Sequence, residues 1–194
     1  MVNIVLSKGR IEKTFISRLI EKRIINKFNY DRELVINLKN LEIWIVNSKD
    51  VFPLLERESS IGVVGSDVIE EYKQNDFVEL LDLNTGVCDF SLATMPSTNL
   101  EDIKLIATKY PEIAKKCLKE LKLKCEIIKK SGSLELYPRI GYADGIIDLV
   151  ETGNTLKANG LVVLKRFEKI STKVITKKEN KDNKEIKELI KRLK

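Results

Sequence analysis

The sequence GYADGIIDLVETGNTL, residues 141–156, decides the class of fold because it joins a strand, a polar loop and the start of a helix. Residues 145–150 form an apolar run that is typical of a buried strand. Residues 151–155 are polar and predict a loop, and a short helix is predicted over residues 156–159, ended by Gly160. Strands that alternate with helices in this way indicate an α/β protein.

The same stretch carries side chains that suit a phosphorylated sugar. Asp148 is expected near the carboxyl end of the strand, where a carboxylate can accept hydrogen bonds from vicinal ribose hydroxyls. The loop residues that follow it are Thr152, Gly153, Asn154 and Thr155. Their backbone N–H groups and hydroxyls can surround a phosphate, and the glycine permits a close approach of the backbone. An ordinary capped loop with a buried aspartate has the same pattern, so both interpretations stay open on this spacing alone.

Alternation of strands and helices continues on both sides of this stretch, which predicts a largely parallel sheet. Further strands are predicted over residues 3–6, 34–36, 41–46, 61–64, 88–93, 105–108, 125–128, 162–164 and 173–175. Helices are predicted from residue 11, over 51–57 and 111–121, and after 131–133. Asp50 and Asp67 are predicted to cap the helices that begin beside them. A stripe at 186, 189, 190 and 193 predicts a final helix whose apolar face packs on the first domain or on another subunit.

Composition excludes several kinds of chemistry. The 194 residues include no histidine, which removes Ser/His/Asp and Cys/His catalysis and histidine metal sites. The three cysteines have spacings that match no zinc or disulfide framework, so we interpret them as packing residues in a reducing compartment. No apolar run approaches the ~20 residues of a membrane span, and the N-terminus does not resemble a secretory signal. We therefore expect a cytoplasmic protein that does not associate with membranes.

A net charge of +6 suits either nucleic acid or a polyanionic small substrate. The lysines are spread along the whole chain and do not form a cluster. Only 6% of residues are aromatic, so few side chains are able to stack on nucleic-acid bases. We therefore expect no nucleic-acid partner. The positive field would steer an anionic substrate into a cleft.

A second candidate site is SKGR, residues 7–10, at the first junction between a strand and a helix. Lys8 as a point charge and Arg10 as a bidentate fork can bind a diphosphate. A solvated first helical turn has the same residues, so the fragment alone favours that simpler interpretation. Three isolated charges near predicted loop ends would, by themselves, be surface groups: Arg32, Lys109 and Glu135.

Several segments taken together resemble the ATP phosphoribosyltransferase family, in family order and over nearly the whole chain. They are LSKGR at 6–10, GVVGSD at 62–67, LLDL at 80–83, IATKYP at 106–111, SGSLE at 131–135 and the stretch from 141 to 161. The resemblance implies a two-lobed fold of the periplasmic-binding-protein type (type II) with the active site in the interdomain cleft. We expect one domain over residues 1–93 plus 169–194 and a second, for phosphoribosyl pyrophosphate (PRPP), over residues 94–168.

The resemblance also implies the first step of histidine biosynthesis, in which ATP and PRPP give phosphoribosyl-ATP and pyrophosphate with Mg²⁺. Asp148 matches the ribose-binding aspartate of the family. The loop for the PRPP 5′-phosphate matches Glu151, Thr152, Gly153, Asn154 and Thr155. Lys8 and Arg10 match a basic pair at the cleft, and Arg32 falls where short-form members hold the nucleotide or leaving group. No protein side chains are expected to form a metal site of their own.

Three residues depart from the family pattern: Asn47, Ser66 and Asp89 each stand where a cation is frequent. These departures affect the expected contacts to ATP and pyrophosphate more than they affect the expected contacts of the PRPP loop. The chain resembles the short form, which implies a homodimeric core and a larger hetero-oligomer with a regulatory subunit similar to histidyl-tRNA synthetase. The alternatives are a non-catalytic two-lobed module that binds an anionic solute, and a basic nucleic-acid binder.

Overall fold

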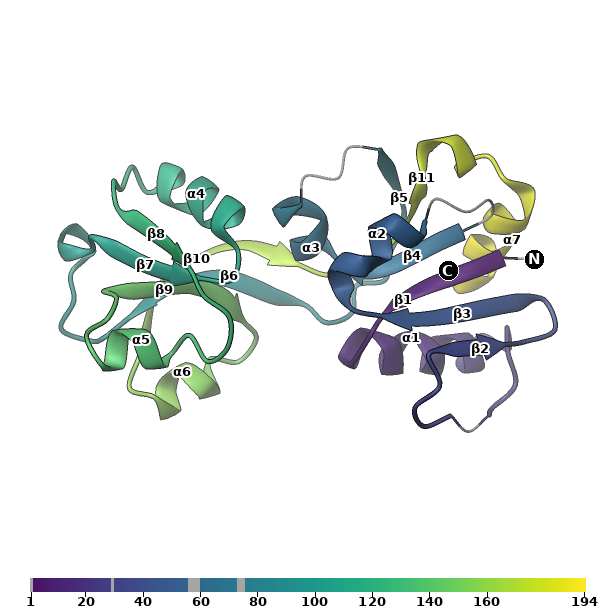
Figure 1. Ribbon diagram of the computed structural model, residues 1–194, viewed down its shortest axis with the longest axis horizontal. Coiled ribbons are helices and arrows are strands. Elements are labelled where there is room, and N and C mark those ends of the chain that lie inside the picture. The colour runs from purple at the N-terminus through teal and green to yellow at the C-terminus, as the bar shows by residue number, and fades with distance from the viewer. Residues whose placement is uncertain (1, 29, 56–59, 73–75) are drawn as a thin grey trace. The chain divides into compact units, whose positions relative to one another are not determined.

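The computed structural model describes residues 2–28, 30–55, 60–72 and 76–194 (Figure 1). Its contacts divide the chain into two units. Unit 1 contains Met1–Ile69, Lys73–Gly86 and Ser171–Lys194, and unit 2 contains Glu70–Tyr72 and Val87–Ile170. Unit 2 therefore includes residues 70–72, 87–93 and 169–170, which the sequence analysis assigned to the first domain. Strands β6 (Cys88–Thr94) and β10 (Val162–Ile170) pair with each other, which keeps both in unit 2.

Unit 1 is built on a mixed sheet with the strand order β2-β3-β1-β4-β11-β5. The strands are β1 (Val2–Ser7), β2 (Val35–Asn37), β3 (Leu41–Val46), β4 (Ser60–Gly65), β5 (Phe77–Asp82) and β11 (Thr172–Lys177). Strands β3, β1 and β4 run parallel, while β2 and β11 are antiparallel to their neighbours. The prediction of a largely parallel sheet is therefore wrong, because β11 enters between β4 and β5 in the opposite direction.

Helices cover both faces of the unit 1 sheet (Figure 1). They are α1 (Arg10–Glu21), α2 (Val51–Leu54), α3 (Ser66–Glu71) and α7 (Lys184–Leu193), with 3-10 helices η1 (Ser48–Asp50) and η3 (Lys178–Asn180). Side chains of α1 and α7 share one apolar cluster with β1 and β3. Residues of α2 and α3 pack on the other face beside Trp44. The predicted stripe Ile186, Leu189, Ile190 and Leu193 is buried in the first cluster, which confirms it as a packing face.

Unit 2 has a five-stranded sheet with the order β10-β6-β9-β7-β8. Its remaining elements are β7 (Leu105–Thr108), β8 (Glu126–Lys129), β9 (Gly145–Val150), α4 (Pro111–Glu120), α5 (Leu136–Arg139), α6 (Asn154–Ala158) and η2 (Leu100–Asp102). Helix α4 packs on one face through Ile113, Cys117 and their neighbours. Leu134 and, on α6, Leu156 cover the opposite face. Strand β9 lies in the middle of this sheet, parallel to β7 and antiparallel to β6.

Two predicted helix starts and one predicted capping side chain differ from the structure. Asp50 does not cap α2 with its side chain; its carboxylate instead accepts a hydrogen bond from the Asn47 amide, 3.2 Å away. Asp67 lies inside the first turn of α3, because that helix already begins at Ser66. The helix expected after residues 131–133 begins only at Leu136. Part of the helix predicted over 51–57 lies outside the described residues.

The cysteines agree with the expectation that they are packing residues. All three cysteines are free, with Cys88 and Cys117 buried and Cys125 half-buried. Burial, aided by nearby carboxylates, raises the pKa of Cys117 to about 12. Among the described helices, none has the length and apolar character that a membrane span requires.

Candidate functional site

The loop after β9 lies at the carboxyl end of the central strand of unit 2. Strand β9 has the predicted bounds, and α6 begins at Asn154, two residues earlier than expected. Gly153 immediately before it has φ 78°, a left-handed conformation that favours glycine. This turn lets the backbone reverse and present the N–H groups of the following residues.

One cavity of about 230 Å³ brings together the predicted residues of this segment. Its lining consists of Glu135 and residues 148–156, so it contains Asp148 and all five residues of the predicted phosphate loop. The side chains and backbone of one short segment thus face a common space. A pocket of this kind, with few converging polar groups, suits a small ligand.

Asp148 is held in place by two donors from the protein. One carboxylate oxygen accepts the Leu149 N–H at 2.9 Å, and the other lies 3.3 Å from the Lys109 ammonium group. Only 16% of the Asp148 side chain is exposed. A carboxylate has about four acceptor positions, so each oxygen keeps one for a ligand. Two remaining acceptors on one carboxylate match a pair of adjacent hydroxyls.

The charge state of Asp148 reflects opposing influences. Burial raises its pKa above the ordinary value, while Lys109 and the Leu149 N–H act in the opposite direction. Negative charge on Glu135 adds to the increase. The balance leaves the pKa raised, so this carboxylate is less stable in its ionised form than an exposed aspartate.

Lys109 and Glu135 are therefore neighbours of the site that sequence reasoning interpreted as surface groups. Lys109 follows β7, which lies beside β9 in the sheet, and it is 39 residues away from Asp148 in sequence. Glu135 precedes α5 and lines the cavity. The sequence did contain a signal for both residues, because they belong to the IATKYP and SGSLE segments that carry the family resemblance.

The predicted cations Lys8, Arg10 and Arg32 belong to unit 1. The backbone N–H of Lys8 donates to the carbonyl of Val46 at 2.8 Å, and Arg10 begins α1. The intervening Gly9 has φ 100° and its N–H donates to the Glu12 carboxylate at 2.9 Å. This ordered turn presents Lys8 and Arg10 as exposed residues.

Arg32 differs from that pair. Its side chain is 95% exposed, and its Nε lies 3.9 Å from the Asp31 carboxylate. Two of the residues that stand where the family frequently has a cation, Ser66 and Asp89, make local contacts. Ser66 accepts a hydrogen bond from the Ser171 N–H at 3.2 Å, and Asp89 pairs with Arg166 on the neighbouring strand at 3.0 Å.

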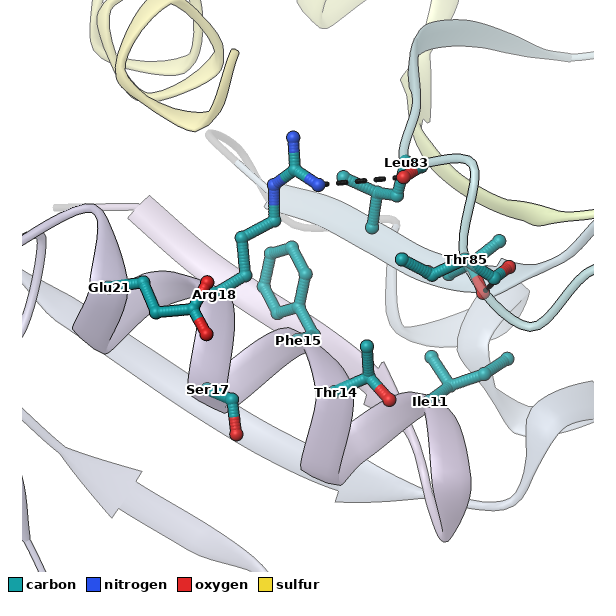
Figure 2. A pocket seen from close by; sticks show the side chains of 9 residues that line it. Ile11, Thr14, Phe15, Ser17, Arg18, Glu21, Leu83 and Thr85 are labelled. Atoms are coloured by element: carbon teal, nitrogen blue, oxygen red, sulfur yellow. Dashed lines mark hydrogen bonds between the residues drawn. The ribbon is translucent and has the colours of Figure 1, made fainter.

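A smaller cavity, of about 140 Å³, lies beside α1 in unit 1. Figure 2 shows Arg18 extending from α1 toward the carbonyl oxygen of Leu83, and the same guanidinium donates to the Leu193 carbonyl at 2.9 and 3.1 Å. These bonds tie α1 to the end of α7. Arg18 therefore has a structural role there.

Among residues 2–28, 30–55, 60–72 and 76–194, no group of three or more acidic or cysteine side chains is arranged to hold a metal ion. Mg²⁺ often takes most of its ligands from waters and substrate phosphates, so it does not require such a group of protein side chains.

Comparisons with known proteins define the class to which this arrangement belongs. The model of the family "ATP phosphoribosyltransferase" (HisG) matches residues 48–194. An ATP phosphoribosyltransferase of Clostridium botulinum (strain Okra / Type B1) is 42% identical over 187 residues, covering 91% of this chain and 88% of the relative. That of Lactococcus lactis subsp. cremoris (strain MG1363) is 41% identical over 186 residues, covering 92% and 89%.

Solved structures agree with the sequence relatives. A chain of the ATP phosphoribosyl transferase (HisG:HisZ) complex from Thermotoga maritima superposes with a TM-score of 0.85 at 27% identity, covering 100% of this chain and 96% of that one. The periplasmic VFT2 domain of Bordetella pertussis BvgS matches with a TM-score of 0.58 at 12% identity, covering 100% and 93%, which concerns the fold alone.

The fold is thus the two-lobed α/β type of periplasmic binding proteins, and unit 2 carries a pocket lined with acidic and hydroxyl side chains. The chain belongs to the ATP phosphoribosyltransferase family, which places it among the pentosyltransferases.

Proposed function

We propose that this chain transfers the phosphoribosyl group of PRPP to N1 of the adenine ring of ATP, giving phosphoribosyl-ATP and pyrophosphate in the first step of histidine biosynthesis. Family membership supports the reaction. The observation that carries the site is the single cavity that contains Asp148 together with residues 151–155.

In this proposal the unit 2 cavity binds the phosphoribosyl group. The two open acceptor positions of Asp148 receive the ribose hydroxyls. The 5′-phosphate lies against the loop, where Thr152 and Thr155 supply hydroxyl donors and Gly153 allows close approach of the backbone. Glu151 and Asn154 complete that loop. Holding the sugar at both ends fixes the anomeric carbon for attack and so lowers the entropic part of the barrier.

The chemical step is a displacement at the anomeric carbon. The bond from this carbon to the diphosphate oxygen breaks, and a bond to N1 of adenine forms with the lone pair of that nitrogen. Positive charge develops on the ribose ring in the transition state. The carboxylate of Asp148, held in a mostly buried position, stabilises that charge. No side chain has to act as a nucleophile, which is compatible with a chain without histidine.

The departing diphosphate requires positive charge, which Lys8, Arg10 and Arg32 of unit 1 supply in this proposal. We propose that the two units are the two domains of the enzyme and that both contribute residues to substrate binding. Mg²⁺, bound mainly by the phosphates of the substrates, would neutralise charge on the leaving group.

The proposal extends to assembly. The Thermotoga maritima relative is described as a HisG:HisZ complex. We propose a homodimeric catalytic core here that joins a regulatory subunit similar to histidyl-tRNA synthetase in a larger hetero-oligomer. Feedback by histidine then requires the regulatory subunit, and strong inhibition of the isolated chain by histidine would contradict this arrangement.

One assay tests the activity. The chain is incubated with ATP, PRPP and Mg²⁺, with and without the regulatory subunit, and phosphoribosyl-ATP is followed by absorbance. Release of pyrophosphate that depends on both substrates supports the transferase. Binding of PRPP without turnover in either condition supports the alternative, a non-catalytic module for an anionic solute. Tight, salt-sensitive binding to DNA or RNA would favour the third interpretation.

A further inference from the structure

The ammonium group of Lys109 reaches the site from a different element than the one that carries Asp148. Lys109 is the residue after β7, and its Nζ lies 3.3 Å from the Asp148 carboxylate. The side chain is 40% exposed, so the ion pair lies at the rim of the cavity and not in the core. Within the lining of that cavity, Glu135 and residues 148–156 include carboxylates but no lysine or arginine. Lys109 therefore supplies a positive charge that the lining itself lacks.

Hydrogen bonds fix the backbone that carries Lys109. The buried hydroxyl of Thr108 donates to the Ile147 carbonyl at 2.6 Å and accepts the Tyr110 N–H at 3.0 Å. The first bond ties the end of β7 to the residue before Asp148. The second bond closes the turn in which Lys109 is the central residue. The turn is thus attached to β9 at the point where the lysine must reach the carboxylate.

The other end of this turn is also held. Helix α4 begins at Pro111, and the carboxylate of Glu71 accepts the N–H groups of Glu112 and Ile113, each at 3.1 Å. A carboxylate at the start of a helix satisfies backbone donors that have no partner inside the helix. Lys109 therefore lies in a short segment that is anchored on both sides, which limits the positions its ammonium group can take.

We propose that Lys109 is a positioning residue for the phosphoribosyl site: its ammonium group keeps Asp148 ionised and in one orientation, so that both free acceptor positions face the ribose, and Thr108 fixes the turn that carries it. This inference rests on the proposed function for the identity of the ligand. A buried carboxylate beside other carboxylates tends to take up a proton, and a protonated Asp148 loses an acceptor. The charge of Lys109 opposes that tendency.

The surroundings of Asp148 identify which groups act on its charge. Glu135, ahead of α5, and Glu151, in the loop, line the same cavity and are negative. The residue opposite Asp148 on β6 is Ser91, which has no charge. Lys109, from the turn after β7, is the cation that acts on it, and the Leu149 N–H acts as a neutral donor. Removal of Lys109 leaves Asp148 with Glu135 as its negative neighbour and with one backbone donor.

The first test measures the carboxyl group directly and requires no turnover. The free chain is labelled with ¹³C-aspartate, and the Asp148 signal, assigned by its loss in Asp148→Asn, is titrated with pH. Lys109→Met should raise the pKa of Asp148, while Lys109→Arg should return it toward the wild-type value. Lys165→Met is the matched control, because Lys165 is 46% exposed and its ion pair at 3.8 Å is with Glu120, away from the cavity lining. An unchanged titration in Lys109→Met would overturn the proposal.

The second test measures the consequence for PRPP. We expect Lys109→Met to lower kcat/KM for PRPP about tenfold, the lower end for a hydrogen bond between charged groups because Lys109 is partly exposed. The acid limb of that pH profile should move to higher pH, and KM for ATP should stay unchanged. Thr108→Val should show a smaller loss in the same direction, and Thr108→Ser should restore the wild-type value because it keeps the hydroxyl.

The outcomes separate the two proposals. No turnover in the wild type with its regulatory subunit would reject the proposed function, and the titration would still decide the role of Lys109. Normal turnover with the same PRPP kinetics in Lys109→Met and wild type at every pH would reject the positioning role alone.

Discussion

The pocket of unit 2 and the cationic residues of unit 1 organise their functional groups in different ways. In unit 2, one contiguous segment from Asp148 to Thr155 lines a single cavity, and its carboxylate already has two protein donors. In unit 1, Lys8 and Arg10 are exposed around one ordered turn, and Arg32 is almost fully exposed on another segment. Under the proposed function, the sugar site is therefore preorganised, whereas the cations act mainly through charge.

The largest effect should come from removing the preorganised carboxylate. Asp148→Ala is expected to lower kcat/KM for PRPP by about 100-fold or more, because a fixed charge in a mostly buried site is lost. Steady-state kinetics measure the change, and circular dichroism checks that the fold is intact. Thr155→Ala should give a smaller loss in the same parameter. Normal kinetics in both variants would remove the assignment of the pocket.

A smaller effect is expected at the exposed pair of unit 1. Lys8→Ala and Arg10→Ala should each lower kcat/KM by about tenfold, and the loss should shrink as salt is added because exposed charges are screened. The effect of Asp148→Ala should depend much less on salt. Equal salt dependence at the two sites would contradict the distinction between preorganised and mainly electrostatic groups.

Arg32 should show a weaker effect still. Its side chain is 95% exposed and has one ionic contact at 3.9 Å, so Arg32→Ala should leave stability unchanged. We expect a rise of about threefold or less in an apparent KM, measured separately for ATP and PRPP. Lys39→Ala, on a separate exposed turn, serves as the control for net charge. A loss as large as that of Asp148→Ala would show that Arg32 becomes ordered when substrates bind.

The smallest effect concerns stability. Burial raises the pKa of Asp148, so its stabilising contribution is present below the ordinary aspartate pKa and is lost as pH rises through the raised value. Asp148→Asn removes this dependence. At neutral pH it should slightly increase the free energy of unfolding while lowering activity. Denaturant unfolding at several pH values measures the difference, which should vanish at the acidic end. A destabilised Asp148→Asn at neutral pH would mean that the Lys109 pair dominates.

Local patterns predicted much of the fold. The bounds of β9 follow from an apolar run that ends at a polar loop, and the buried face of α7 follows from its helical spacing. The position of Asp148 in the site was predictable because one strand and the loop after it stay together in any α/β arrangement. The start of α6 differed by two residues because Gly153 adopts a left-handed turn before Asn154.

The pairing of strands that are distant in the sequence could not be predicted from these patterns. Strand β11 has a short apolar run that fits either direction in a sheet, and only its partners β4 and β5 make it antiparallel. Lys109 resembles many other lysines of the chain, and its contact with Asp148 depends on β7 lying beside β9. Such contacts depend on the order of the strands in the sheet, and the residue pattern within one segment does not specify that order.

The order of segments along the chain has a consequence for synthesis. Residues 87–170 of unit 2 are consecutive, whereas the unit 1 sheet is interrupted until β11 enters between β4 and β5. On the ribosome, the nascent chain therefore completes the unit 2 sheet first, although unit 1 contains the N-terminus. The apolar faces of β1 and α1 stay partly uncovered until α7 has been synthesised and packs on them. We expect truncation before Ser171 to leave unit 1 prone to aggregation in the cell while unit 2 can still fold.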